Sequence, residues 1–313
     1  MAKYPDFLKE GDEVRIVSPA GAIEPVFVDG AIITLTSWGF KATEGMFTRH
    51  ALGRYAGNEQ ERYTDLQQAL DDPRVKAILC SRGGYGLAQI IDRIDFSRFL
   101  KNPKWVIGFS DITILHQAIL STGFISIHGV MAKQLTELPA HSEALLLLEN
   151  ILKGKTPSYK IIPDAKNRQG TAKGKLIGGN LSVFMGMRGT KFDLSFKNSI
   201  LFIEDVGEKP YQVDRMLQNL RISGALSQLS GLLVGQFTEY DEDPDMKKSL
   251  HQIIADAVKD YDYPVCYNFS AGHIDQNFPL LMGATAELSV EKNGAGLTFQ
   301  TTFWIKAEKL LNL

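Results

Sequence analysis

The chain has 313 residues, of which 44% are hydrophobic and 22% charged, a composition typical of a soluble globular protein with two domains. Its formal net charge of −2 gives no basic surface for nucleic acid or an anionic membrane. Cys80 and Cys266 lie far apart in apolar runs, so we expect buried thiols and neither a disulfide nor a metal site. The sequence shows no membrane-spanning run and no secretory signal, so we expect a cytoplasmic protein.

Strands and helices alternate along the first half of the sequence. Asn58 and Glu61 have capping-box spacing and predict the start of a helix. Such alternation predicts a mostly parallel sheet with helices on both faces. The predicted strands are 14–17, 40–43, 75–80, 105–109 and 124–127. A first helix is predicted to end near residue 39, and further helices are predicted at 58–70, 87–94, 111–122 and 142–152.

The second half of the sequence has a different pattern of predicted elements. Segment 154–173 is polar, contains Pro157 and Pro163 and lacks an apolar period, so we predict a linker there. Asn293 and Gly294 predict a hairpin turn between strands 286–290 and 297–300. Further strands are predicted at 199–203, 231–234 and 264–269, and helices at 210–220 and 245–261. We therefore predict an α/β protein with an N-terminal domain 1–153, a linker 154–173 and a smaller α+β or swivelling domain 174–313.

Ser110 stands where the predicted strand 105–109 turns into a helix. A sharp turn of this kind pushes a side chain out of the sheet edge, and the first N–H groups of the helix can bind an oxyanion. Gly108 leaves room for the turn. Serine is also a favoured N-cap residue, so taken alone Ser110 is more simply explained as a helix cap.

Residues 82–86, Arg-Gly-Gly-Tyr-Gly, follow a predicted strand and open a helix, as phosphate-binding loops do. The dinucleotide fingerprint is incomplete, because Gln89 stands where a third small residue is required. Segment 170–175 has the wrong spacing for a P-loop. The loop is better suited to presenting backbone N–H groups to an oxyanion, since Gly83 and Gly84 allow close approach. We expect no cofactor.

A serine nucleophile needs a base and a group that orients the base. His273 lies in a loop after a predicted strand, where α/β proteins place their chemistry. Glu204 ends the apolar run 200–203, a position that suits an active-site acid or an ordinary exposed carboxylate. His273 and Asp275 have no second cluster of ligands beside them, so we expect no metal.

The other histidines are weaker candidates for the base. His116 lies off the face of Ser110 on the same helix. His128 ends a strand and could reach the cleft, although a structural role is more common. Polar surroundings indicate that the remaining three, His50, His141 and His251, are solvated.

Six stretches, residues 11–20, 82–86, 108–111, 178–182, 201–205 and 272–273, together resemble the murein L,D-carboxypeptidase family. That family also includes self-immunity hydrolases for microcin C. The resemblance runs over nearly the whole chain and departs from the family at Val130, where proline is usual. It implies a flavodoxin-like N-terminal domain, a swivelling β/α C-terminal domain, an active site between them and a homodimer.

The resemblance implies a cytoplasmic serine carboxypeptidase that removes the terminal D-alanine from muropeptide tetrapeptides in murein recycling. No cofactor, metal, nucleic acid or membrane is expected to take part. The expected site consists of a triad of Ser110, Glu204 and His273, an oxyanion hole from the N–H groups of Asp111 and of Gly83 or Gly84, and Arg82 and Asn180 as candidate substrate contacts.

Two other functions stay open. A microcin-type amidase on the same scaffold would need an aromatic platform, and the chain has no tryptophan between Trp105 and Trp304 and only Tyr159 in the predicted linker. A non-catalytic flavodoxin-like module would use 82–86 as a ligand loop. An α/β-hydrolase is disfavoured, because Ile112 stands where that fold expects glycine.

Overall fold

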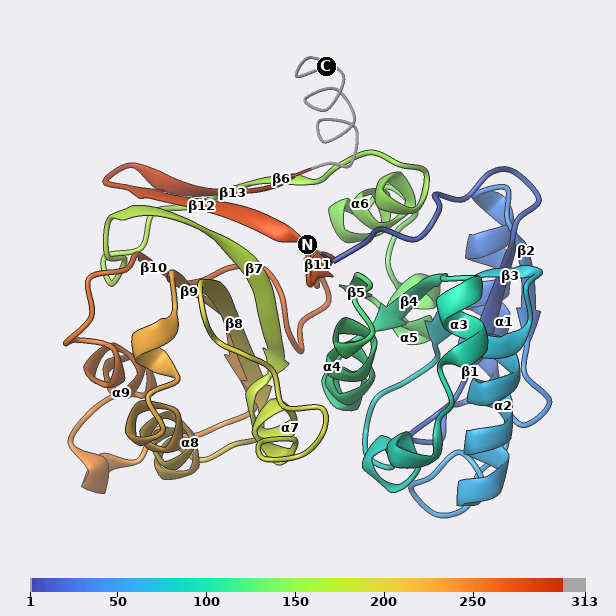
Figure 1. Cartoon of the computed structure of the whole chain (residues 1–313), viewed down its shortest axis with the longest axis horizontal. Coiled ribbons are helices and arrows are strands. Elements are labelled where there is room, and N and C mark those ends of the chain that lie inside the picture. Colours follow the sequence, from blue (N-terminus) through green and yellow to red (C-terminus); the bar gives the residue numbers. More distant parts are fainter. Residues whose placement is uncertain (1, 301–313) are drawn as a thin grey trace.

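Residues 2–300 are described by a computed structural model, in which two β-sheets lie side by side (Figure 1). The first sheet has the strand order β11-β5-β4-β3-β1-β2, and the second has the order β10-β9-β8-β7-β12-β13-β6. Helix α4 (Thr113–Ser121) lies between them and contacts both β7 and α7 of the second half. The confirmed α/β architecture therefore places the end of β4 at the junction of the two halves.

The six-stranded sheet has the parallel order 2-1-3-4-5 of flavodoxin-like folds, as predicted. Its parallel strands are β1 (Glu13–Val17), β2 (Lys41–Glu44), β3 (Val75–Cys80), β4 (Trp105–Gly108) and β5 (Ser126–His128), and β11 (Leu280–Met282) pairs antiparallel with β5. The helices of this half besides α4 are α1 (Pro25–Ser37), α2 (Glu59–Asp71), α3 (Ser97–Lys101), α5 (Ala132–Glu137) and α6 (Glu143–Leu152).

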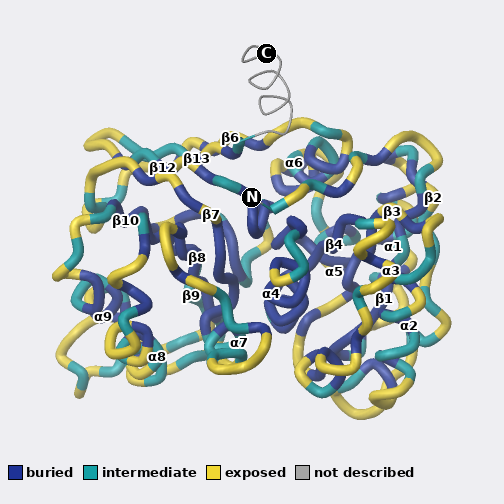
Figure 2. Tube along the Cα trace, in the orientation of Figure 1, coloured by how far each residue is buried: buried dark blue, intermediate teal, exposed yellow. Residues whose placement is uncertain are grey.

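Burial on both faces explains the apolar strands of this sheet. Along β3, Ala77 and Leu79 join the core cluster that contains α1, α5 and α6, whereas Ile78 and Cys80 join the cluster that contains α2, α3 and α4. The inner strands β1, β3, β4 and β5 are accordingly buried along most of their length, whereas the edge strand β2 is not (Figure 2). The capping box of α2 is present as predicted, with the Asn58 side chain accepting from the Glu61 N–H at 3.0 Å.

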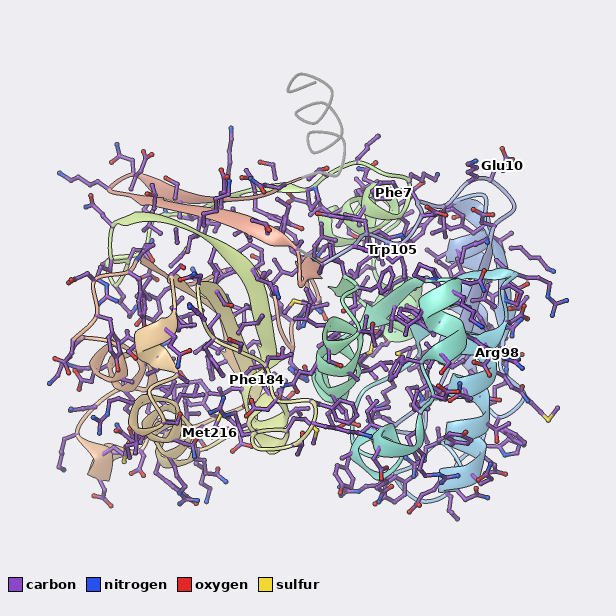
Figure 3. The ribbon with its side chains drawn as sticks, in the orientation of Figure 1. Phe7, Glu10, Arg98, Trp105, Phe184 and Met216 are labelled. Carbon is purple, nitrogen blue, oxygen red and sulfur yellow. The ribbon has the colours of Figure 1, made fainter. Side chains whose placement is uncertain are left out.

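The N-terminal segment packs over the start of β4. The ring of Trp105 stacks on that of Phe7 with centroids 5.8 Å apart, and its indole N–H donates to the Asp6 carbonyl at 3.1 Å (Figure 3). This anchoring fixes the strand whose other end carries Ser110.

The seven-stranded sheet is parallel on one side and antiparallel on the other. Strands β7 (Gly170–Asn180), β8 (Ser199–Val206), β9 (Gly231–Thr238) and β10 (Val265–Cys266) are parallel, and β12 (Thr285–Glu291), β13 (Gly294–Phe299) and β6 (Ser158–Ile161) add antiparallel pairs. The predicted hairpin is therefore confirmed. Helices α7 (Leu181–Gly186), α8 (Pro210–Ile222) and α9 (Leu250–Ala257) pack on this sheet.

Three predicted elements differ from the structure. The predicted linker 154–173 contains β6, where Tyr159 and Ile161 point inward in a period-two pattern too short to recognise, and it also contains the start of β7. The predicted helix 87–94 is two short 3₁₀ turns. The helix predicted over 245–261 covers only α9, which begins at Leu250 because the Ser249 side chain caps it by accepting the Gln252 N–H. Strand β11, which belongs to the predicted C-terminal domain 174–313, pairs into the first sheet, so the domain division stays a prediction. Residues 301–313 of that predicted domain, including Trp304, lie outside the described residues.

Both cysteines are buried and free, as predicted. Within residues 2–300, no helix is both long enough and apolar enough to cross a bilayer.

Candidate active site

Ser110 occupies a strained turn directly after β4. Its φ of +64° lies in the left-handed region, which costs a residue with a side chain about 1–2 kcal/mol. Gly108 makes the turn possible, since a Cβ there would lie 3.0 Å from the Ile112 side chain and 3.1 Å from that of Cys80. Ser110 Oγ lies 3.0 Å from His273 Nε2, and neither the helical turn Ser110–Ile112 nor α4 has a side-chain cap, so the structure does not support the alternative of a simple helix cap.

Three of the expected residues form a hydrogen-bonded relay across the junction of the two halves. His273 Nδ1 lies 2.8 Å from Glu204 Oε2, and His273 Nε2 faces Ser110 Oγ. A carboxylate can only accept, so the proton of the neutral imidazole belongs on Nδ1 and Nε2 is left as the acceptor for the Ser110 hydroxyl. Ser110 comes from the first sheet, and the other two residues come from the second.

A bulge beside β8 gives Glu204 its position. From Ile203 to Asp205 the strand advances by two residues while its partner β9 advances by three, from Val234 to Phe237. The additional residue on β9 opens space for the loop that carries His273. Gly235 is needed at this bulge, since a Cβ there would lie 2.5 Å from the Ala271 carbonyl oxygen. The Glu204 side chain is fully buried.

The loop that carries His273 is held from three sides. Gln236 N–H donates to the Ala271 carbonyl at 2.9 Å, and the Asn277 side chain accepts the Gly272 N–H at 2.9 Å. The imidazole of His273 packs edge-on against the ring of Phe109, with centroids 4.9 Å apart. A Cβ at Gly272 would lie 2.9 Å from Glu204 Oε2, so glycine allows the loop to approach the carboxylate.

Burial and charge act in opposite directions on His273. Burial alone would lower its pKa, but the hydrogen bond and charge of Glu204, with the charges of Asp205 and Glu239, raise the pKa above its usual value. The carboxylates thus stabilise the imidazolium that a general base forms when it accepts a proton.

The loop after β3 touches the serine. A Cβ at Gly83 would lie 2.6 Å from Ser110 Cβ and 2.9 Å from its Oγ, so only glycine fits there. Gly84 has a φ of +92°, in the region that favours glycine. Both glycines line the same cavity as Ser110. The loop that carries two of the expected oxyanion donors therefore lies against the serine side chain, and their role in binding an oxyanion stays a prediction.

Two buried charged side chains support this loop. The Asp111 carboxylate accepts the Leu87 N–H at 2.9 Å, and the Arg62 guanidinium donates to the Gly86 carbonyl at 2.6 Å and to Gln89 at 2.7 Å. Burial raises the pKa of Asp111 to about 6, against the opposing hydrogen bonds and the charge of Arg62. These contacts fix the end of the loop and the first 3₁₀ turn after it, in the segment 87–94 for which the sequence predicted one longer helix.

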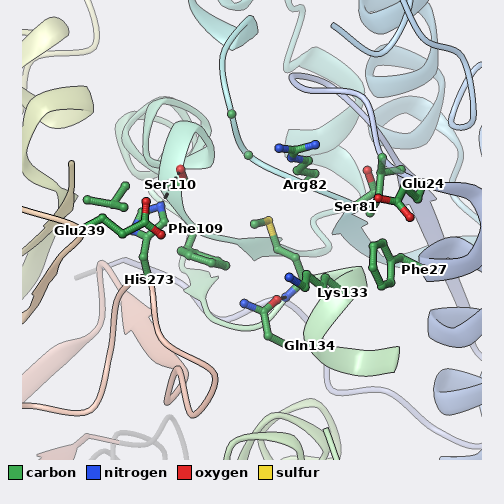
Figure 4. A pocket seen from close by; sticks show the side chains of 15 residues that line it. Glu24, Phe27, Ser81, Arg82, Phe109, Ser110, Lys133, Gln134, Glu239 and His273 are labelled. Atoms are coloured by element: carbon green, nitrogen blue, oxygen red, sulfur yellow. Dashed lines mark hydrogen bonds between the residues drawn. The ribbon is translucent and has the colours of Figure 1, made fainter. Parts of the chain in front are cut away.

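A cavity of about 500 Å³ opens beside the relay (Figure 4). Arg82 lies on its wall, with one guanidinium nitrogen donating to the Ala22 carbonyl at 2.7 Å. In addition to Ser110, His273 and residues 81–84, the lining consists of Ile23, Glu24, Phe27, Phe109, Met131, Lys133, Gln134, Val206 and Glu239.

Asn180 does not fit its expected role as a substrate contact. Its buried amide donates to Asp205 at 2.8 Å and accepts from Ser182 at 3.0 Å and from the Val183 N–H at 3.1 Å, so it caps α7 instead of reaching the cavity. The preceding Gly179 is important for the contact between the two halves. A Cβ there would lie 2.6 Å from Thr113 Oγ1, so this glycine lets the two halves dock closely.

His116 and His128 have no place in the relay. His116 is buried and bridges the Gly108 carbonyl and the Ser126 hydroxyl at 2.8 Å each, so it supports the turn before Ser110. Burial lowers its pKa to about 4. His128 is fully buried against the rings of Phe109 and Phe202, and burial, with the charges of His116 and His273, holds its pKa well below the usual value. Both residues are therefore neutral structural groups.

Several site residues were not predicted from the sequence. Arg62 lies on a helix rich in polar residues, and Asn277 lies in a loop, so neither carries a local signal. The cavity residues Glu24, Lys133 and Glu239 come from three distant segments. The carboxylate of Asp111 could have been noticed, since it follows Ser110 directly.

The chain matches known proteins over most of its length. Residues 14–129 match the family description "LD-carboxypeptidase N-terminal domain", and residues 173–288 match "LD-carboxypeptidase C-terminal domain". A Bacillus subtilis protein named "probable murein peptide carboxypeptidase" is 34% identical over 299 residues, which cover 93% of each chain. The murein tetrapeptide carboxypeptidase of Pseudomonas aeruginosa is 32% identical over 288 residues, which cover 88% of this chain and 92% of its own.

Solved structures of similar fold include a carboxypeptidase and a microcin self-immunity protein. The crystal structure of muramoyltetrapeptide carboxypeptidase from Oxalobacter formigenes superposes with a TM-score of 0.84 and 28% identity, covering 92% of this chain and 99% of its own. The wild-type microcin C7 self-immunity protein MccF superposes with the same TM-score but 20% identity, covering 95% of this chain and 98% of its own. The likeness to MccF shows the fold alone.

Proposed function

This chain belongs to the LD-carboxypeptidase family, and from that premise we propose that it is a serine carboxypeptidase that releases the terminal D-alanine from murein tetrapeptides. The observation that carries the proposal is the relay from Ser110 through His273 to Glu204 beside an open cavity. Such a relay can activate a serine for acyl transfer, in which a nucleophile, a base and an orienting acid act together.

The proposed reaction has two acyl-transfer steps. Ser110 Oγ attacks the carbonyl carbon of the residue before D-alanine while His273 Nε2 takes the hydroxyl proton. The resulting oxyanion accepts hydrogen bonds from the N–H of Asp111 and from that of Gly83 or Gly84. When the C–N bond breaks, the imidazolium returns the proton to the amine of D-alanine. A water molecule then attacks the acyl-serine, with His273 again as the base, and restores Ser110.

Glu204 is the proposed positioning residue of this base. Its carboxylate accepts the Nδ1 proton of His273, which holds the tautomer that the first step needs. Because the carboxylate is buried, its charge is little screened by water and stabilises the imidazolium between the two proton transfers.

Arg82 is the proposed partner of the substrate's terminal carboxylate. It precedes Gly83, the residue whose backbone touches the serine, and the hydrogen bond to Ala22 fixes its guanidinium on the cavity wall. A guanidinium binds carboxylates with two parallel hydrogen bonds, which suits an enzyme that acts only at a free C-terminus. From the family resemblance we further propose a cytoplasmic homodimer that needs neither metal nor cofactor.

The test is mass spectrometry of products from a murein tetrapeptide that ends in D-alanine. We expect loss of one D-alanine by the wild type and no loss by Ser110→Ala. Matched substrates with D-alaninamide or L-alanine at the end should be poor, since the first lacks the carboxylate and the second has the wrong configuration. An intact tetrapeptide, together with cleavage of a peptidyl nucleotide, would favour the microcin-type function instead.

A further inference from the structure

The cavity beside Ser110 has an uneven distribution of charge. Its two acidic side chains are Glu239, which lies beside His273, and Glu24, which lies at the far end beside Phe27 (Figure 4). Arg82 and Lys133 lie between these ends. A substrate that reaches Ser110 therefore meets a negative charge on one side of the serine and two positive charges on the other.

This order of charges sets the direction of a bound peptide. A carboxypeptidase substrate carries a carboxylate on the leaving side of the scissile bond, close to the reacting carbonyl. Pointing that carboxylate toward Glu239 would bring like charges together, whereas pointing it toward Arg82 pairs opposite charges. The residue before the scissile bond, whose acyl group Ser110 takes, then lies on the side of Glu239.

Glu239 is set apart from the other acids of its loop. The loop after β9 also contains Asp241, Glu242, Asp243 and Asp245, none of which lines the cavity. Two of these support the backbone, since Glu242 accepts the Leu250 N–H at 2.9 Å and Asp243 accepts the Asp245 N–H at 3.0 Å. Glu239 instead lines the cavity, on a backbone with a φ of +54°, an unusual conformation for a residue with a side chain. Its charge is felt at the active site, because it contributes to the raised pKa of His273.

We propose that Glu239 is a specificity-determining residue that selects substrates with a positively charged side chain on the residue before the scissile bond. This inference rests on the proposed carboxypeptidase function and specifies the kind of acyl residue that the site takes. An ammonium group at the end of a long, flexible side chain can reach a carboxylate at the edge of the cavity. Because Glu239 is exposed, the preference is moderate and sensitive to salt.

The experiment compares tetrapeptides that end in D-alanine and differ only in the third residue, which is lysine, Nε-acetyl-lysine or norleucine. For the wild type we expect kcat/KM to be about fivefold higher for lysine than for either neutral residue, the size of a good exposed ion pair. Glu239→Gln should bring this ratio close to one, and Glu239→Lys should invert it. Changes that affect all substrates equally, such as a shift in the pKa of His273, cancel in the ratio.

The matched control is Glu24→Gln, which removes the same charge from the far end of the same cavity. It should keep the wild-type preference for lysine. Equal kcat/KM for all three peptides in the wild type, or an unchanged ratio in Glu239→Gln, would overturn the assignment of Glu239 while leaving the carboxypeptidase function intact. If the wild type releases D-alanine from none of the peptides, the proposed function fails and the inference fails with it.

Discussion

The six-stranded sheet presents its part of the site on a strained turn, whereas the seven-stranded sheet presents Glu204 within strand β8 and His273 on the loop after β10. Ser110 sits in the left-handed region, braced by Gly83 and by the buried side chains of Asp111 and Arg62. Glu204 needs no such strain, because the bulge opposite β8 makes room for it. The difference indicates that the first half fixes where the serine stands, while the second half gives it a base.

Removing the serine tests the contribution of the first half and should have the largest effect. Ser110→Ala should lower kcat by at least about 10⁴-fold, and adding His273→Ala should cost little more, because members of a triad act as a unit. Ser121→Ala, on the exposed end of α4, is the matched control and should keep wild-type activity. Fully additive losses in the double variant would show that the two residues do not act together. Activity is measured as D-alanine release from a murein tetrapeptide.

Removing the charge of Glu204 tests the second half. Glu204→Gln keeps the volume but should lower kcat by about 10³-fold, since the tautomer and the imidazolium lose their support. The wild-type acid limb of kcat/KM should lie above pH 6.5, because the base must be neutral and the pKa of His273 is raised. In the variant this pKa falls, so the limb should move to lower pH. A limb that stays in place would argue against the contact between Glu204 and His273.

Crowding the serine turn is the next smaller perturbation. Gly83→Ala places a methyl group within 2.6–2.9 Å of the Ser110 side chain and should lower kcat by about 10²-fold through the displaced oxyanion donors. Gly186→Ala is the control, because a Cβ there meets nothing within 4 Å. Equal kcat values for the two variants, with thermal unfolding showing both to be folded, would remove the 82–86 loop from the site.

The buried carboxylate of Asp111 should affect stability more than catalysis. Its pKa is raised from 3.8 to about 6, so the fold favours the protonated form, and this stabilisation is lost as pH rises from about 4 to about 6. Relative to Asp111→Asn, the free energy of unfolding of the wild type should therefore fall by about 3 kcal/mol over that window. Denaturant unfolding at pH 4 and pH 7 measures it. Parallel changes in the two proteins would mean that Asp111 ionises freely in the fold.

The two halves also differ in how much of their fold and of their site residues could be predicted from the sequence. The alternation of strands and helices, the Asn58 capping box and the position of Ser110 depend on neighbouring residues, so they could be predicted. The triad assignment of Glu204 and His273 came from the family resemblance, because these residues are 69 positions apart and meet only through the bulge in β9. Asn180 was misjudged because capping and substrate binding use the same polar amide. The short strands β6 and β11 were missed because their partners lie more than a hundred residues away in the sequence.

Fluorophosphonate labelling followed by peptide mass spectrometry tests most directly whether the second half activates the serine of the first. These reagents attack activated serines, and His273→Ala leaves Ser110 in place while removing its base. We predict one adduct, on Ser110, in the wild type, and labelling slowed by orders of magnitude in His273→Ala. Labelling of Ser110 at the wild-type rate in His273→Ala, or an adduct on a different residue, would contradict the account.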